Sequence, residues 1–293
     1  LADPFEAEII SVPARGVERW LTQRLSMSLG SDRGDGIAAN IEFPSPTTLV
    51  ERSLAAVEGV PAEEDPWSRG RLLWTTLAVI DESMNQSWCS VIGAHLGHGR
   101  DEHRAGRRWS TAAHLTDLFR GYCADRPSMI ADWSRGVYSD GLGGSLPQDL
   151  RWQAELWRSV RTRIGSPSPA ERLGDSCAAL GGSPELLDLP ERLSIFGATR
   201  MTTDQLQVVA ALARHREVHL WIPHPSAKMW DRLSERPAPV RRREDTAAAT
   251  LDHPLLASLA RDVRELQARI LRLGAGVQQT VEAEDPSPPT LLG

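Results

Sequence analysis

The feature that most constrains this chain is its opening stretch, where an apolar run leads directly into an amphipathic segment. The apolar run comprises Ile9, Ile10 and Val12, and Pro13 ends it. From Gly16 onward, apolar residues recur at helical spacing, namely Val17, Trp20, Leu21, Leu25 and Leu29. A buried strand that continues into a helix is the first half of a βα unit, so the sequence predicts a parallel sheet with helices packed on it.

The turn at residues 13–16 lies where such sheets bind their ligands, beyond the carboxyl end of a strand. In P-loop nucleotidases, a glycine-rich turn at such a strand end carries a lysine that holds phosphate. This turn has the strand and the helix but lacks the lysine. It is therefore a candidate binding site without the usual phosphate ligand.

The basic residues argue against two kinds of catalysis. The single lysine is Lys228, which has neither the glycines of a Walker A loop beside it nor the carboxylates of an Asp…Glu-x-Lys nuclease. The apolar segment Leu193–Phe196 is followed by Gly197 rather than by the acid of a Walker B motif. We expect this stretch of chain to hydrolyse neither ATP at a P-loop nor DNA at such a nuclease site.

Composition sets further bounds. With 41% apolar and 25% charged residues over 293 positions, the chain is globular, and it has no apolar run long enough to cross a membrane. Three widely spaced cysteines fit a reducing compartment, here the cytoplasm. The net charge of -6 does not favour binding of nucleic acid overall but leaves room for a locally basic groove.

The irregularly spaced histidines of the loop near His98 do not have the spacing of a structural zinc site, so no metal is expected. No signal peptide follows Leu1, and we expect the natural start to lie upstream.

The pattern divides the chain into four segments: 1–58 and 185–234 are two parts of one α/β domain, 59–184 is an all-helical insertion, and 235–293 is a mobile loop, a helix and a tail. Strands are predicted at 37–43, 192–197 and 218–222 in addition to the opening one. Predicted helices span 16–29, 47–57, 67–84, 127–133, 148–164, 169–180 and 253–273, and Ser110 and Thr203 are expected to cap two more. We expect Thr47 or Thr48 to cap the helix at 47–57, with Glu51 completing a capping box.

Four ordered blocks carry a resemblance to a known family. They are Gly36–Pro44 with the opening stretch, Asp117–Phe119 through Tyr122 to Pro127, Leu189–Gly197 with Gln205, Leu206 and Val218–Leu220, and His253–Arg261. Together they resemble the N-terminal part of the RecC family, the gamma subunit of exodeoxyribonuclease V. The resemblance implies a degenerate superfamily 1 helicase-like (RecA-like) parallel sheet core without an ATP site, with a large all-helical insertion. It also implies a strand and helix before Leu1, and most of the subunit after Gly293.

The function implied by the resemblance is that of a non-catalytic DNA-binding subunit of a RecBCD-type helicase–nuclease in double-strand break repair and recombination. Such a subunit splits duplex ends, channels single strands and scans for a regulatory, Chi-like sequence. It works in a heterotrimer with RecB-like and RecD-like subunits, which are expected to hold the ATP and Mg²⁺; no cofactor and no membrane is expected for this chain. The alternative is a scaffold that docks a motor partner without touching DNA, which the acidic net charge favours.

Eight residues match DNA-facing positions of the family: Pro13, Arg15, Arg19, Ser45, Glu51, Asp117, Leu118 and Arg120. Each also has an ordinary structural role. Arg15 and Arg19 are equally well explained as solvated charges, and Glu51 is better explained by the capping box. Leu118 and its neighbour Phe119 also suit the core, which for Phe119 is the better explanation. Among the tryptophans, Trp20, Trp74, Trp152 and Trp157 are expected in the core, whereas Trp67, Trp109 and Trp133 are candidates for exposure and base stacking.

Overall fold

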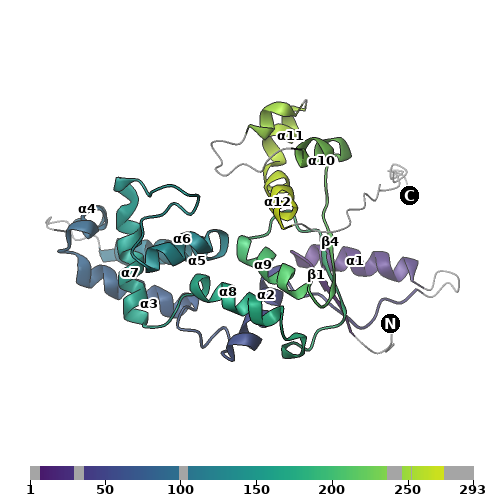
Figure 1. Cartoon of the computed structure of the whole chain (residues 1–293), viewed down its shortest axis with the longest axis horizontal. Coiled ribbons are helices and arrows are strands. Elements are labelled where there is room, and N and C mark those ends of the chain that lie inside the picture. The colour runs from purple at the N-terminus through teal and green to yellow at the C-terminus, as the bar shows by residue number, and fades with distance from the viewer. Residues whose placement is uncertain (1–6, 30–35, 99–104, 236–245, 252, 274–293) are drawn as a thin grey trace. The chain divides into compact units, whose positions relative to one another are not determined.

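A computed structural model describes residues 7–29, 36–98, 105–235, 246–251 and 253–273 (Figure 1). The chain forms two compact units, Leu1–Ile222 and Pro223–Gly293, which we describe separately. The division into 1–58, 59–184, 185–234 and 235–293 is finer than this and stays a prediction. The predicted tail at 281–293 and most of the predicted mobile loop lie outside the described residues.

The first unit contains a four-stranded parallel sheet in the order β2-β1-β3-β4. Its strands are β1 (Glu8–Ser11), β2 (Ile41–Glu42), β3 (Arg192–Phe196) and β4 (Glu217–Trp221). Ile9 lies between Glu42 on one neighbour and Leu193 on the other. The prediction of an α/β chain with a parallel sheet assembled from both ends of this unit is confirmed.

The second strand is much shorter than the predicted strand at 37–43. Asn40 adopts a left-handed backbone conformation with φ of 57°, which interrupts extended structure just before Ile41. The carbonyl of Asn40 accepts a hydrogen bond from the backbone N–H of Glu8 at 3.0 Å, so the irregular residue still anchors β1.

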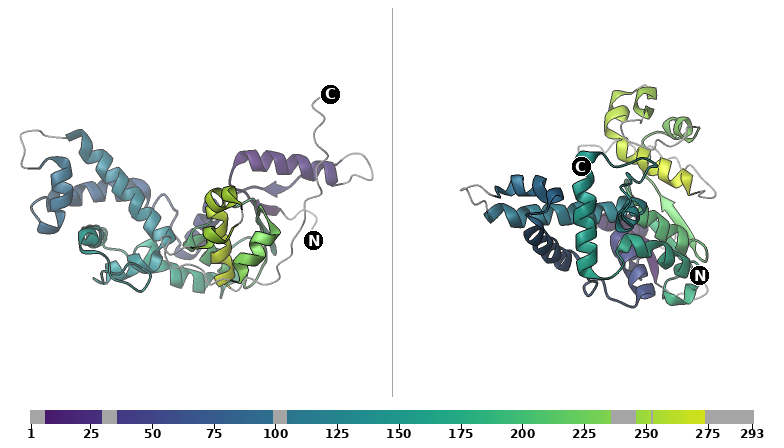
Figure 2. Two further views of the ribbon diagram at one scale, coloured as in Figure 1. Left: turned by 90° about the horizontal axis from the view of Figure 1, so that it is seen from above. Right: turned by 60° about the vertical axis from the view of Figure 1, so that its left-hand side comes forward.

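Four helices pack against the sheet (Figure 2), namely α1 (Arg15–Ser28), α2 (Pro46–Glu58), α8 (Pro169–Leu180) and α9 (Thr203–Leu212). Side chains alternate between the two faces of a strand. On one face, Ile9 and Leu193 are buried in a cluster with residues of α2, α8 and α9. On the other face, Phe196 stacks against Trp20 of α1, with the ring centroids 6.0 Å apart.

The insertion is helical, as predicted. It contains α3 (Arg69–Ser83), α4 (Ser90–Leu96), α5 (Ala105–Asp125), α6 (Pro127–Ser134) and α7 (Arg151–Ile164), with short 3₁₀ turns at Ser87–Cys89 and Gln148–Leu150. A further 3₁₀ turn, Pro184–Leu186, follows α8. The expected cap at Ser110 is wrong, because α5 already begins at Ala105 and the Ser110 hydroxyl donates to the Arg107 carbonyl at 3.0 Å.

The core of the insertion corrects the predicted tryptophan roles. Trp67 and Trp133 are buried, not exposed, and Trp67 packs on the buried Trp157 with ring centroids 5.0 Å apart. Conversely, Trp20 and Trp74 are 49% and 62% exposed, which contradicts the prediction that both lie in the core. Trp109 is exposed and Trp157 is buried, as expected.

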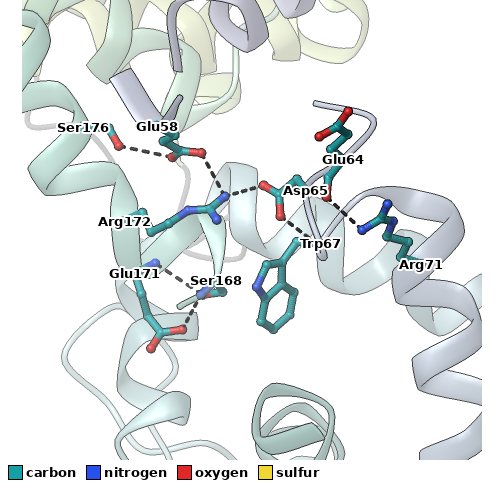
Figure 3. A network of polar contacts seen from close by, with 9 residues as sticks. All are labelled: Glu58, Glu64, Asp65, Trp67, Arg71, Ser168, Glu171, Arg172 and Ser176. Atoms are coloured by element: carbon teal, nitrogen blue, oxygen red, sulfur yellow. Dashed lines mark hydrogen bonds and ion pairs between the residues drawn. The ribbon is translucent and has the colours of Figure 1, made fainter. Parts of the chain in front are cut away.

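A polar network joins the start of the insertion to α2 and α8, the helices that pack on the sheet (Figure 3). The chain leaves α2 at Glu58, enters the insertion at Asp65, and returns to α8 through Ser168. The guanidinium of Arg172 on α8 lies 3.2 Å from the Glu58 carboxylate and 2.5 Å from that of Asp65, while Glu58 also accepts from the Ser176 hydroxyl at 3.3 Å. One arginine therefore ties together the outgoing and the returning segments of the chain.

The second unit contains α10 (Ala227–Ser234), a 3₁₀ turn (Ala247–Thr250), α11 (Pro254–Leu259) and α12 (Arg261–Arg272). The predicted single helix at 253–273 is broken at Ala260. Arg264 explains the break, since its guanidinium donates to the Leu256 and Ala257 carbonyls at 2.8 and 3.0 Å and satisfies the end of α11.

Candidate nucleic-acid interface

The carboxyl ends of β1 and β3 meet behind the turn at residues 13–16. Gly197, directly after β3, has φ of +77°, and a Cβ built on it would lie 3.6 Å from Val17 Cγ1 and 3.9 Å from Pro13 Cδ. The backbone N–H of Val12 donates to the Pro44 carbonyl at 3.0 Å, which fixes the end of β1 to the segment after β2. Pro13 thus lies at a sheet edge built from three strand ends.

Two predicted arginines extend from this edge on the first two turns of α1. Arg15 and Arg19 are one helical turn apart, so they share a face, and both are exposed. Within the described part of the chain, neither guanidinium has an ion pair or hydrogen bond to another side chain. The next residue, Trp20, is held against Phe196, and Arg24 lies over its ring at 5.8 Å from the centroid.

Ser45 has a structural role that the sequence assigned to its neighbours. Its hydroxyl accepts the Thr48 N–H at 3.0 Å and is the N-cap of α2, so the predicted cap at Thr47 or Thr48 is wrong. The residue at the third helical position is consequently Thr48 instead of Glu51, and no capping box forms with Glu51. Glu51 is exposed on α2. Thr47 contacts another helix, since its hydroxyl accepts from Gln205 of α9 at 3.2 Å.

The remaining predicted residues lie on α5 and point in different directions. Asp117 forms a bidentate ion pair with Arg69 of α3, in which Nε and Nη2 of the arginine donate to the two carboxylate oxygens at 2.7 and 2.8 Å. This hydrogen bonding lowers the pKa of the Asp117 carboxyl. Leu118 is half-buried and lines a cavity of about 510 Å³ between α4, α5 and α7, together with Leu115 and Trp152. Arg120 is exposed. The neighbouring Phe119 is fully buried, as expected.

The last turn of α5 reaches the loop between β3 and α9. The Asp125 carbonyl accepts from the Thr203 hydroxyl at 2.9 Å, and its carboxylate lies 3.2 Å from Arg200. The expected helix cap is one residue earlier, at Thr202, where a capping box forms with Gln205. Burial raises the pKa of the adjacent Asp204, although its hydrogen bond from Thr202 opposes the shift.

The structure therefore brings Pro13, Arg15 and Ser45 to one sheet edge, with Arg19 one turn beyond. At 1.5 Å per residue, Asp117 and Arg120 lie about 12 and 8 Å along α5 toward its N-terminus from Asp125, the residue that contacts Arg200 and Thr203. Leu118 faces the cavity instead. Contact of these residues with DNA stays a prediction.

Sequence reasoning predicted the exposure of Trp109 but missed that Trp74 is exposed beside it and forms an aromatic pair with it. A signal was present in the helical spacing. Trp74 is separated by about 100° or more from the buried residues Leu73 and Ile80 when α3 is viewed along its axis. Its position therefore lies outside the apolar stripe of this helix.

Other classes of site find no support in the described residues. There, no three His, Cys, Asp or Glu side chains are grouped so as to hold a metal ion. Lys228 lies exposed on α10, in the second unit. None of the helices described is both long and apolar enough to cross a membrane.

Fold and site together define an α/β protein with a large helical insertion, whose candidate interface is formed by arginines and aromatic rings at the edge of a parallel sheet. A family model described as RecC, N-terminal domain, matches residues 1–293. The RecBCD enzyme subunit RecC of Mycolicibacterium smegmatis is 44% identical over 271 residues, covering 91% of this chain and 23% of that protein. The chain therefore belongs to the RecC family.

Other relatives agree with this assignment. The corresponding subunit of Mycobacterium tuberculosis is 43% identical across 99% of this chain and 26% of its own length. That of Escherichia coli is 27% identical across 80% of this chain and 20% of its own length. The chain spans between 20% and 26% of the length of these curated relatives.

Proposed function

We propose that this chain is part of a non-catalytic DNA-binding subunit of a RecBCD-type helicase–nuclease, acting in double-strand break repair and recombination. The longer protein splits duplex ends, channels the single strands and scans one of them for a Chi-like sequence. RecB-like and RecD-like subunits in the cytoplasm supply ATP hydrolysis, Mg²⁺ and nuclease activity. Membership of the RecC family supports this proposal.

The proposal includes a superfamily 1 helicase-like, RecA-like ancestry for the α/β part, with loss of its ATP site. The parallel sheet and the position of the helical insertion, between α2 and β3, support it. So does the end of β3, which is followed by Gly197 where a Walker B strand would be followed by an acid. ATP turnover by the purified chain above the background of a mock preparation would refute this part.

The observation that carries the DNA-binding role is the placement of Arg15 and Arg19. Both are exposed just beyond the carboxyl end of β1, where ligands of parallel sheets bind. Arginine offers a planar fork of donors that suits phosphates and base edges. Pro13, by contrast, offers neither a backbone N–H nor a side-chain donor. The sequence read at this edge should therefore depend on the arginines.

The test uses the full-length protein in its assembled complex and a fluorescent forked DNA. We expect Arg15→Gln and Arg19→Gln to weaken binding and to reduce the slope of log affinity against log salt by about one for each phosphate that is no longer neutralised. The matched control is Arg163→Gln, an exposed arginine of α7 that is ion-paired with Glu82 at 2.6 Å. Unchanged affinity and salt slope in both test variants would contradict the assignment. Loss of subunit assembly with unchanged DNA affinity would instead favour the docking scaffold.

A further inference from the structure

Two tryptophans of the insertion form an aromatic pair on its surface. Trp74 of α3 and Trp109 of α5 meet edge to face, with ring centroids 4.9 Å apart, and remain 62% and 46% exposed. The same insertion buries Trp133 and Trp157 completely or nearly so. Large aromatic rings contribute most to stability when buried, so a paired exposure of this kind is typical of a binding surface.

Ion pairs on both sides hold the aromatic pair in place. Asp81 and Arg108 are joined through Arg108 Nε at 3.0 Å, and Arg69 and Asp117 through Arg69 Nε at 2.7 Å. The first of these pairs joins the end of α3 to the start of α5, and the second joins the start of α3 to a later part of α5, so the helices run antiparallel. The rings are thus presented by two helices that are joined by two ion pairs, and this restraint reduces the entropy lost when a ligand binds.

The charged residues nearest the pair along the sequence are all arginines. Within four residues of either tryptophan along the sequence, the charged residues are Arg71, Arg107 and Arg108, whereas the whole chain carries a net charge of -6. Arg71 and Arg107 are exposed, and Arg71 is steadied by a hydrogen bond to the Glu64 carbonyl at 2.9 Å. Aromatic rings flanked by arginines offer stacking to bases and charge to phosphates.

The pair also continues a surface that was predicted on other grounds. Arg120 follows Trp109 by eleven residues, which places it about 16 Å along α5 and rotated by only about 20°. Trp109 and Arg120 therefore share one face of the helix, and Asp117 lies between them beside that face.

We propose that Trp74 and Trp109, with Arg71 and Arg107, form a stacking platform for single-stranded DNA that extends the α5 surface around Arg120 along the insertion. This inference rests on the proposed DNA-handling function and adds to it a surface that binds bases without reading their sequence. Because every base has a stackable face, the platform should accept any sequence.

The test compares a blunt duplex with a duplex bearing a single-stranded thymidine tail, using the full-length protein assembled with its partner subunits. We expect the double variant Trp74→Ala and Trp109→Ala to weaken binding of the tailed DNA about tenfold or more, as loss of base stacking does elsewhere. Affinity for the blunt duplex and the salt slope should not change, because a tryptophan releases no counterions. The matched control, Trp74→Phe with Trp109→Phe, keeps aromatic faces and should retain most of the affinity.

A separate pair of variants tests the charges. Arg71→Gln and Arg107→Gln should each reduce the salt slope for tailed DNA by up to about one. Tailed-DNA binding that is unchanged by the alanine pair would overturn the platform, and so would failure of the alanine variant to assemble with its partners, which would identify the pair as a protein contact. A wild-type complex that does not bind DNA at all would refute the proposed function itself, so the two failures are distinguishable.

Discussion

Arg172 allows a quantitative test of how the insertion is fixed to the sheet. We predict that Arg172→Gln destabilises the chain by removing the cation that lies 3.2 Å from Glu58 and 2.5 Å from Asp65. The three side chains retain only 24%, 18% and 16% of their exposure, so water cannot fully replace the missing cation. Breaking a fully buried ion pair costs about 3–5 kcal/mol and an exposed one about 0–1, which places this change at about 2–3 kcal/mol.

The control is Arg163→Gln, which removes the same kind of side chain from a pair with Glu82 whose members are 44% and 64% exposed. Its cost should stay at or below about 1 kcal/mol. Both variants can be compared by urea unfolding followed by near-ultraviolet circular dichroism, which reports on packed aromatic residues such as Trp67 beside this network.

The cost should also depend on pH, with a definite sign. Burial raises the pKa of Glu58, against the opposing effect of Arg172, so the folded state holds this proton more tightly than the unfolded chain. The contribution of Glu58 to stability therefore falls as the pH rises from the ordinary glutamate range through the raised value. Without Arg172 that fall should be steeper, so the variant should lose more stability at pH 7.5 than at pH 4.5. An equal loss at both pH values, or a loss no larger than that of the control, would refute the reasoning.

Three further outcomes are expected. Ser45→Ala should cost about 1 kcal/mol of unfolding free energy by removing the N-cap of α2. Glu51→Ala should change the unfolding free energy measured in urea by less than about 0.5 kcal/mol. A larger effect of Glu51→Ala would contradict the observed cap. Gly197→Ala should cost about 1 kcal/mol or more and lower the melting temperature in calorimetry, because φ of +77° strains any residue with a Cβ; an unchanged melting temperature would show that this turn relaxes. Cys89 is fully buried and burial raises the pKa of its thiol, so it should resist alkylation by iodoacetamide at pH 8 until the chain is unfolded, as mass mapping would reveal.

Local pattern was sufficient where one face of an element is buried. The spacing of apolar residues predicted α6 and α8 to within a residue and located β3, because a periodic apolar face reports directly on burial. It was insufficient where backbone geometry or long side chains intervene. The left-handed Asn40 shortened β2, and Arg264 ended α11 through carbonyls that no apolar pattern describes.

The candidate site shows the same division. The sequence alone indicated a strand end with Arg15 and no lysine, and it contains, in order, the four blocks that resemble the RecC family. It did not reveal that Asp117 is engaged by Arg69, since those residues are 48 positions apart.

What the sequence by itself determined is the class of the fold and the absence of a lysine at the first strand end, because period and residue type are local properties. What only the tertiary structure decided is which residues lie together: Pro13 near Gly197, Arg172 between Glu58 and Asp65, and Trp74 beside Trp109 on the surface. Those contacts depend on how elements that are distant in the sequence pack together, and no local pattern specifies that packing.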